Sequence, residues 1–533
     1  MNNKVSFRKA SLIIGVILAS SILSIVSAQS PQPATLPVES ITAAELRDHI
    51  FFLASDYLGG RVATTAEYDI AARYVATQFA SAGLMPVTEL EDGSKSYFQE
   101  VPFSKTTYGE NITWSLNKNG KTTELIHKED FKILFASNLN HKDLEFVFIG
   151  YGIQEDDQGW NDFKNLDVKG KIMICMLGAP VKDGDPVFPL EINDKYSGMM
   201  GLQSKISGLF SKEAAGIILV DVDGSSGLPF DALPSRFDTV KYVYKGNVQG
   251  GESESIPSIY LVKPDVIKQI LEGEKYSPFD NPGDPLKKYA TFTLKKTLLN
   301  SSIEILSEEP VFTKNIIGMV EGTDPELKNE YIIIGAHLDH VKPVMGQVCN
   351  GADDNASGSA GVMEIAEAVA AEPFRRSVIF IAYTAEEMGL RGSHFFISSG
   401  IIPKEKILFN VNMDMIGRSS ENNMATRAHY VVTHKKYVDQ MSSFINDINS
   451  GVTDFPLLIE NDEDSPGGSD HQSFISEGIP AFFFFSGLHE DLHQPGDDAE
   501  KIDYAKAESI SRLAFLIAGK LANMDKVPDF LNE

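Results

Sequence analysis

The chain has 533 residues, and its 47 Lys and Arg residues against 74 Asp and Glu residues give a formal net charge of −27. This length predicts two or three domains with a sizeable core, and two cysteines rule out a disulfide scaffold. The acidic surplus argues against a nucleic-acid-binding protein, which needs a basic surface facing the phosphates. A content of 43% hydrophobic and 10% aromatic residues is typical of a globular protein rather than a disordered acidic one.

Residues 1–28 have the features of a secretory signal peptide. Lys4, Arg8 and Lys9 form a positive segment, and an apolar run follows from Leu12 to Val26. The small residues of Val26-Ser27-Ala28 fit a signal-peptidase cleavage site. The alternative is an N-terminal membrane anchor, for which the run is short. We therefore expect export to the periplasm or the extracellular space, with no stable membrane insertion after the signal is removed.

Two helices are predicted early in the mature chain, over residues 43–56 and 66–82. In the second helix Ile70, Tyr74, Val75 and Phe79 share one face, and Gly83 supplies the stop. From about residue 125 to 295 the pattern changes to short β-rich runs separated by Gly- and Asp-rich turns, which is typical of a small β-rich domain.

From about residue 312 onward, strand-like and helix-like segments alternate, as in an α/β layer fold. The strand-like segments are continuous apolar runs, which indicates a sheet covered on both faces. These runs are Tyr331–Ile334, Ser377–Tyr383, Ile407–Met413 and Ile479–Phe485. Cys175 and Cys349 fall in different predicted domains, so we expect two unpaired thiols rather than a disulfide.

Acidic and imidazole side chains gather where the buried runs of the C-terminal half end. The five clusters are His337-Leu338-Asp339-His340, Asn350–Gly358, Glu386-Glu387, Asn412–Met415 and His489–Pro495. In open α/β sheets, ligands bind beyond the carboxyl ends of the strands. Carboxylates converging on a half-buried crevice would repel one another unless cations neutralised them. A mixed set of imidazoles and carboxylates suits zinc, and more than four candidates indicate two ions sharing a bridging carboxylate.

Two of these clusters suggest a division of roles. Residues i and i+2 of an extended segment point the same way, so Asp339 is placed to orient His337 rather than to bind metal. Glu386 and Glu387 cannot both face one ion in an extended segment, so one is expected to be a ligand and the other a general base.

The segment His489-Glu490-Asp491-Leu492-His493 matches the helical H-E-x-x-H motif of zinc proteases. That motif requires a helix, and Gly487, Pro495 and Gly496 make a helix improbable here. We therefore expect His493 to act as a single loop ligand.

Taken together, these segments resemble the M28 family of co-catalytic zinc exopeptidases. The matching motifs are Gly335–His340, Asn350–Gly358, Ala385–Ser393, Asn412–Gly417, Ser469-Asp470-His471 and His493-Gln494-Pro495. The resemblance implies the zinc-exopeptidase fold, an α/β architecture with a central mixed, mostly parallel sheet flanked by helices. It also implies two zinc ions per chain.

Carried over position by position, the resemblance implies a role for each site residue. His337 and Asp414 would hold one zinc, Glu387 and His493 the other, and Asp353 would bridge the two. Glu386 matches the family's general base and Asp339 its His-orienting aspartate. Asp470 and His471 are candidates to line the site and bind substrate. Cys349 lies four residues before Asp353, where a buried thiol or an approach to the metal site are both open.

The middle of the chain resembles a protease-associated (PA) domain inserted into the peptidase, a type of domain usually thought to shape substrate access. The likeness is carried by Val147–Ile153, Val168–Ile172 and Ala214–Leu219. The expected organisation is a signal at 1–28, the first part of the peptidase domain at 29–124, the PA-like insert at 125–295 and the rest of the peptidase, with the metal site, at 296–533.

The leading functional hypothesis is an exported aminopeptidase that removes N-terminal residues from peptides. A carboxypeptidase or dipeptidase with the same di-zinc site is the main alternative. A glutaminyl-cyclase-like transferase would use one zinc, which the complete ligand set disfavours. An inactive binding protein would usually lack a ligand or the general base, and neither is missing.

Overall fold

The computed structural model describes residues 37–136, 138–182, 185–222, 226–246, 257–280, 291–419, 429–433, 438–450, 457–461 and 468–528. The predicted signal peptide at 1–28 lies outside these residues. Among the residues described, no helix is both long and apolar enough to cross a membrane.

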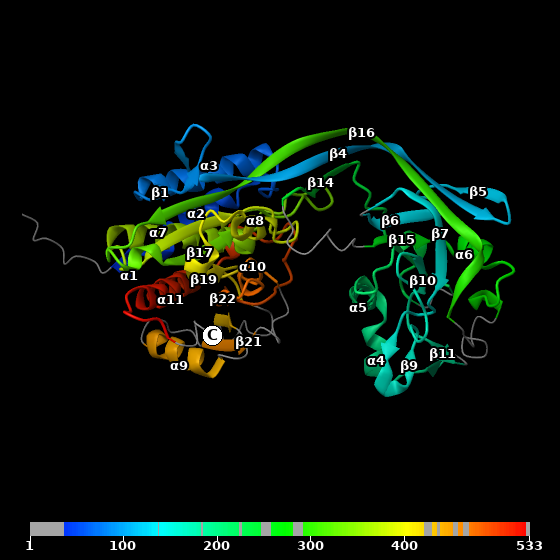
Figure 1. The fold of residues 1–533 in the computed structure, drawn as a ribbon. Helices are drawn as coiled ribbons and strands as arrows, with labels where there is room; N and C mark the ends of the chain where they lie inside the picture. The colour runs from blue at the N-terminus through cyan, green and yellow to red at the C-terminus, as the bar shows by residue number, and fades with distance from the viewer. Residues whose placement is uncertain are drawn as a thin grey trace, which may run out of the picture.

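The C-terminal half forms one lobe around a mostly parallel sheet (Figure 1). β17 (Tyr331–His337) pairs in parallel with β18 (Ser377–Tyr383) on one side and β19 (Ile407–Met413) on the other. β22 (Ala481–Phe485) continues the parallel set beside β19. β20 (His429–Thr433) is antiparallel to β22 and parallel to β21 (Leu457–Asn461), the outermost strand. This arrangement confirms the predicted α/β fold with a mixed, mostly parallel central sheet.

Helices cover both faces of this sheet, as the apolar strands require. One core packs the first face against α2 (Ala43–Leu53), α3 (Ala66–Ser81), α7 (Gly358–Ala371) and α11 (Tyr504–Ala522). The second core packs the other face against α8 (Arg391–Ser399) and α10 (His471–Ile475). These cores hold the carboxyl ends of the parallel strands at one edge of the lobe.

The predicted apolar face of α3 is only partly right. Val75 and Phe79 are buried, whereas Tyr74 is half-buried and Ile70 is exposed. The small residues of the helix, Ala71 and Ala72, face the core instead because α3 lies close against the sheet and α7.

Two long antiparallel strands connect this lobe to a second one (Figure 1). β4 (Phe98–Lys118) and β16 (Phe292–Val320) pair along almost all of β4. β16 begins in the second lobe and ends in the first, where it pairs with β18 and β1 (Met85–Pro86). β14 (Val240–Tyr244) pairs with the middle of β4.

In the second lobe the same sheet continues beyond β16, and this lobe has its own hydrophobic cores. Its strands follow the order β7 (His141–Phe148), β10 (Ile172–Met176), β13 (Gly216–Val220), β15 (Ser258–Val262) and β6 (Phe131–Phe135). The helices α4 (Leu190–Lys195), α5 (Gly198–Phe210) and α6 (Pro264–Leu271) belong to this lobe. The expected boundary near residue 295 falls inside β16, which the two lobes share. The boundary near residue 125 falls at the end of β5 (Lys121–Leu125), which pairs with residues 114–118 of β4.

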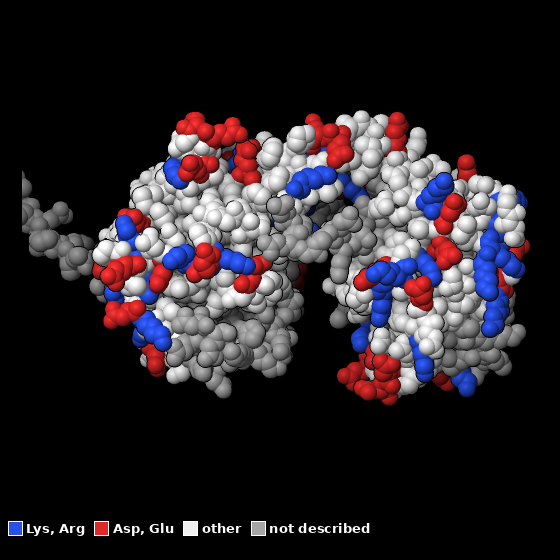
Figure 2. Space-filling view, viewed as in Figure 1, with Lys and Arg blue, Asp and Glu red and all other residues white. Residues whose placement is uncertain are grey.

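The remaining strands and α-helices of the described residues lie outside these groups. They are α1 (Pro37–Ser40), β2 (Thr88–Glu89), β3 (Lys95–Ser96), β8 (Gln154–Glu155), β9 (Trp160–Asn161), β11 (Val181–Lys182), β12 (Asp185–Pro186) and α9 (Val438–Asn449). Acidic and basic side chains are interspersed over the face seen in Figure 2.

Candidate metal centre

The candidate site forms where the parallel strands end. His337 is the last residue of β17, Glu386 and Glu387 follow β18, and Asp414 follows β19. Because parallel strands present their carboxyl ends at one edge, residues 77 positions apart in sequence are brought together there. The edge opens into a cavity of ≈ 360 Å³, lined by these four residues together with Asp354 and His493.

Asp354 is the carboxylate shared by two groups of potential ligands. Its Oδ1 lies 3.4 Å from His337 Nε2, which is also 3.3 Å from Asp414 Oδ1. Its Oδ2 lies 3.1 Å from His493 Nε2. One carboxylate therefore points one oxygen at each group, which is the arrangement of a bridging ligand between two ions.

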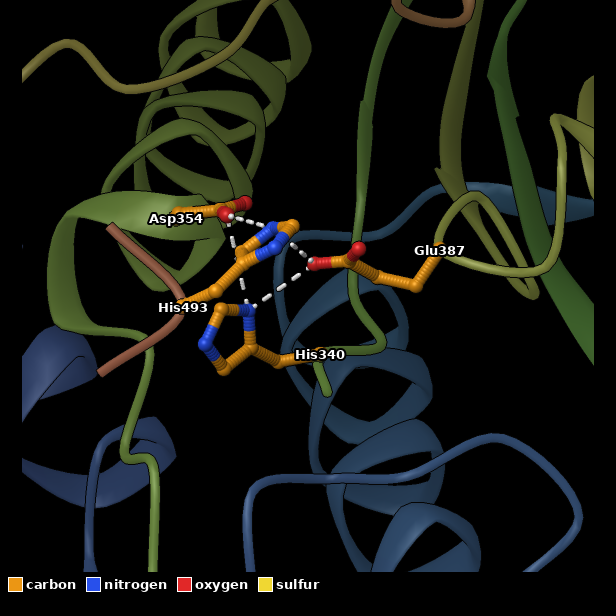
Figure 3. A group of neighbouring side chains, drawn as sticks. All are labelled: His340, Asp354, Glu387 and His493. Atoms are coloured by element: carbon orange, nitrogen blue, oxygen red, sulfur yellow. Dashed lines mark ion pairs between the residues drawn. The ribbon is translucent and has the colours of Figure 1, made fainter. Parts of the chain in front are cut away.

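The second group contains His340 as well as Glu387 and His493 (Figure 3). Glu387 Oε1 lies 3.1 Å from His340 Nδ1 and 3.2 Å from His493 Nε2. The donor atoms of this group all lie within 4.8 Å of one another, as do those of His337, Asp354 and Asp414. Converging imidazoles and carboxylates are the donor types that zinc takes, so the residues present fit two such ions.

The structure places Asp353 elsewhere, in contrast to the expectation that it bridges the ions. Its Oδ1 accepts a hydrogen bond of 2.6 Å from the Gly417 backbone N–H, and its Oδ2 lies 3.3 Å from His489 Nε2. The backbone at Asp354 leaves the helical region (φ −104°, ψ 94°), so the two neighbouring side chains diverge. The sequence offers two adjacent aspartates, and only the path of this loop selects Asp354.

The histidines of the H-E-x-x-H segment do not share a helix face. Residues 486–498 contain no helix, and the two rings lie beside different carboxylates, Asp353 for His489 and Asp354 for His493. The expectation that this segment is a loop is confirmed, and the side chain of His493 remains 46% exposed at the edge of the group.

Asp339 connects two parts of the site rather than meeting His337 through its carboxylate. His337 Nδ1 lies 3.1 Å from the backbone oxygen of Asp339, which leaves Nε2 facing Asp354 and Asp414. The Asp339 carboxylate accepts a 3.1 Å hydrogen bond from the Glu386 backbone N–H. Burial raises the pKa of Asp339 to about 7. Asp339 thus orients the imidazole through its carbonyl and holds the Glu386 loop through its side chain.

Glu386 and Glu387 are adjacent but have opposite shifts in pKa. Burial, aided by the charges of Asp470 and Asp414, raises the pKa of Glu386 well above its ordinary value. Burial also opposes ionisation of Glu387, yet the imidazoles of His340 and His493, 3.1 and 3.2 Å from its Oε1, lower its pKa. A carboxylate that stays charged suits a ligand, and one that readily holds a proton suits an acid–base group.

Two residues that the sequence reasoning did not single out hold the ligand loop in place. Arg61 is fully buried, and its guanidinium donates to the backbone oxygens of Leu53, Leu338, Asn350 and Gly351. The Asp497 carboxylate accepts from the backbone N–H groups of Asp353 and Asp354 at 3.0–3.1 Å. Both residues lie far along the chain from most of the groups they bind, so no local sequence pattern predicts these hydrogen bonds.

The two candidate substrate-binding residues lie behind the cavity wall. Asp470 and His471 are buried, and neither is among the residues that line the cavity, although the preceding Ser469 is. The His471 ring stacks on Phe483 with centroids 4.0 Å apart, and burial lowers its pKa to about 3. Burial raises the pKa of Asp470 to about 7. These positions favour support of the site over direct contact with a substrate.

Cys349 lies beside the loop of His493 and not among the ligand atoms. Its Sγ is 3.8 Å from the backbone oxygen of His493. Cys175 and Cys349 are both free and buried, as expected. Burial raises the pKa of both thiols, to about 11 for Cys175, so neither has the thiolate character of a reactive cysteine.

Comparisons with known proteins relate this chain to peptidases. Residues 315–518 match the family model of Peptidase family M28. Leucine aminopeptidase 1 of Ajellomyces dermatitidis is 28% identical over 219 residues, which are 39% of this chain and 56% of that protein. Leucine aminopeptidase 2 of Trichophyton rubrum is 31% identical over 187 residues, or 33% of this chain and 34% of that one. The matches thus span about half or less of these relatives.

The whole fold also has a solved counterpart. The structure of an aminopeptidase from Aneurinibacillus sp. strain AM-1 aligns with a TM-score of 0.53 over 92% of this chain and 96% of the other, at 20% identity. The fold of this chain therefore occurs in another protein of nearly the same extent.

Proposed function

We propose that the protein is a zinc-dependent aminopeptidase of peptides that belongs to peptidase family M28, because the model of that family matches residues 315–518. In this proposal His337 and Asp414 hold one zinc ion, Glu387 and His493 hold the other, and Asp354 bridges them. Two zinc ions there would supply Lewis acidity that activates water and polarises a peptide carbonyl. Export by the predicted signal peptide is part of the same proposal.

Glu386 is the proposed general base. It lines the cavity, its backbone is fixed by Asp339, and its raised pKa allows it to take a proton from water and return it to the departing amine. The neighbouring Glu387 faces His340 and His493 instead, so Glu387 acts as a metal ligand and Glu386 transfers the proton.

The observation that most favours an aminopeptidase is the charge of the cavity. Among the described residues that line it, four are carboxylates (Asp354, Glu386, Glu387 and Asp414) and none is Lys or Arg. Asp354, Glu387 and Asp414 are proposed zinc ligands, so the ions would offset their charge. A C-terminal carboxylate would still need a Lys or Arg partner, which a free α-amino group does not need. This contrast favours the aminopeptidase over the carboxypeptidase alternative.

The remaining cavity wall indicates which N-terminal residues would be accepted. It is apolar and is formed by Leu390, Met415, Phe483, Phe485, Leu488 and Leu492. A wall of aliphatic and aromatic side chains gains free energy by covering an apolar side chain of a substrate. We therefore include peptides with an apolar first residue in the proposal, as the names of the leucine aminopeptidase relatives would suggest.

The second lobe is proposed to be a PA-like insert that restricts access to the site. Two contacts join it to loops near the ligands. Lys342, two residues after His340, forms a 2.9 Å ion pair with Asp238. The Arg391 guanidinium lies 5.5 Å from the centre of the Tyr244 ring on β14.

The test uses matched peptides with an apolar first residue, one with a free N-terminus and one N-acetylated, with products identified by mass spectrometry. We expect the zinc-loaded protein to release the first residue of the free peptide only. Cleavage of the acetylated peptide from its C-terminal end would refute the aminopeptidase proposal. Glu386→Gln should retain the zinc content of the wild type while losing at least ~100-fold in kcat, since general acid–base groups contribute about 10²–10⁴.

A further inference from the structure

His340 is a buried histidine that is not among the five proposed zinc ligands. It lies three residues after His337, and its side chain is fully buried. Neither of its ring nitrogens has a hydrogen-bond partner of good geometry within the described structure. A buried polar group without such a partner costs about 1–3 kcal/mol, so its position calls for a physical reason.

The His340 ring points into the group that contains Glu387 and His493 (Figure 3). Its Nδ1 lies 3.1 Å from Glu387 Oε1 and 3.6 Å from Asp354 Oδ2. His493 Nε2 occupies the opposite side of the same two oxygens, at 3.2 and 3.1 Å. Two imidazole nitrogens and two carboxylate oxygens therefore alternate around one point.

We propose that His340 is a direct zinc ligand, which gives this ion four protein ligands, two nitrogens and two oxygens. The inference rests on the proposed zinc enzyme and extends it, because His337, Asp354 and Asp414 supply only three ligands to the other ion. The spacing supports the assignment: ligands about 2.0–2.2 Å from a tetrahedral ion lie ~3.4 Å from one another. The four separations of 3.1–3.6 Å match that edge length.

The surrounding backbone leaves space for the His340 ring only because residue 351 is a glycine. A Cβ atom on Gly351 would come within 2.6 Å of the His340 ring, and the residue has a φ of +58°, so glycine is needed there on both counts. The ring of His493 stands edge-on to it, with centroids 5.5 Å apart. His340 is thus held in one orientation by its surroundings.

Four protein ligands close a zinc site, whereas three leave a position for water or substrate. The ion held by His340, Asp354, Glu387 and His493 is therefore the tightly bound one, and the ion at His337 and Asp414 is the exchangeable one that faces the reaction. Loss of His340 should bring the two affinities closer together.

The experiment measures zinc content and zinc affinity on the full-length protein, by elemental analysis after dialysis and by competition with a chromophoric chelator. His340→Ala and His340→Gln are compared with the wild type, and His141→Ala in the second lobe is the matched control. We expect the wild type to lose one ion readily and keep the other. Both His340 variants should bind the retained ion at least tenfold more weakly, while His141→Ala behaves as the wild type.

The glutamine variant separates a ligand from a positioning residue. Gln can still donate a hydrogen bond to Glu387 but is a poor zinc ligand. Wild-type affinity in His340→Gln, or two ions lost equally easily from the wild type, would overturn the inference and leave the aminopeptidase proposal intact. A wild type that binds no zinc would instead refute the proposed function. The visible absorption of the Co²⁺-loaded protein, which reports the geometry of the ligands, should change in both His340 variants.

Discussion

The choice between Asp353 and Asp354 as the bridging ligand is the sharpest test of the site. Replacing Asp354 with Asn removes a carboxylate whose two oxygens lie 3.1–3.6 Å from the ring nitrogens of His337, His340 and His493. Replacing Asp353 with Asn leaves those contacts intact. The pair is closely matched, since the residues are adjacent, both buried and altered by the same substitution.

The two substitutions should differ in how much zinc affinity they remove. Loss of a group that merely supports a metal ligand costs 10–100-fold in affinity, so loss of a bridging ligand should cost more than ~100-fold, or more than ~2.7 kcal/mol, at each ion. In Asp353→Asn the amide oxygen can still accept from the Gly417 N–H, whereas the carboxylate charge and its contact with His489 Nε2 are lost. That change should cost ~1–2 kcal/mol of unfolding free energy with little effect on metal content.

The assay combines elemental analysis after dialysis with thermal unfolding in the presence and absence of zinc. Ions that bind only the folded state raise its stability by about 2.7 kcal/mol at a hundred times their Kd, so the wild type and Asp353→Asn should both show a clear zinc-dependent rise in Tm. Asp354→Asn should show almost none. The reasoning fails if Asp353→Asn loses both ions while Asp354→Asn keeps them.

Three further predictions concern the groups around the ligands. Arg61→Met should lower the unfolding free energy by more than ~3 kcal/mol in urea titrations, because four buried carbonyl oxygens lose their donor; a loss below ~1 kcal/mol would contradict this role. Asp497→Ala should weaken zinc binding about 10–100-fold in chelator competition, since two ligand-loop N–H groups lose their acceptor, and unchanged affinity would disprove it. In metal-free protein the pKa of about 7 at Asp339 lies above the value of an Asp in the unfolded chain, so the folded state binds more protons between pH 4 and 7. The free energy of unfolding therefore falls as pH rises through this range, by up to ~1.4 kcal/mol per pH unit. Asp339→Asn should flatten that slope in unfolding titrations at several pH values, and an unchanged slope would exclude Asp339 as its source.

Four strands of the first lobe could be predicted, two of them residue by residue, whereas β20 and β21 were not predicted. β18 and β19 coincide with the runs Ser377–Tyr383 and Ile407–Met413, because a strand buried on both faces has no polar side to interrupt it. Which residues of a helix face the core was harder to predict. Ile70 on α3 is exposed although its spacing suits the core, since close approach of the helix to its neighbours selects the smaller alanines.

The sequence by itself determined which residue types collect at the ends of these strands, and hence the chemistry of converging imidazoles and carboxylates. Apolar periodicity and composition act locally and can be read without coordinates. Tertiary structure alone decided that Asp354 rather than Asp353 lies between the two groups, that His340 joins Glu387 and His493, and that Asp470 and His471 lie behind the wall. The direction of a side chain in an irregular loop depends on anchors distant in sequence, such as Arg61 and Asp497, and no repeat in the chain encodes it.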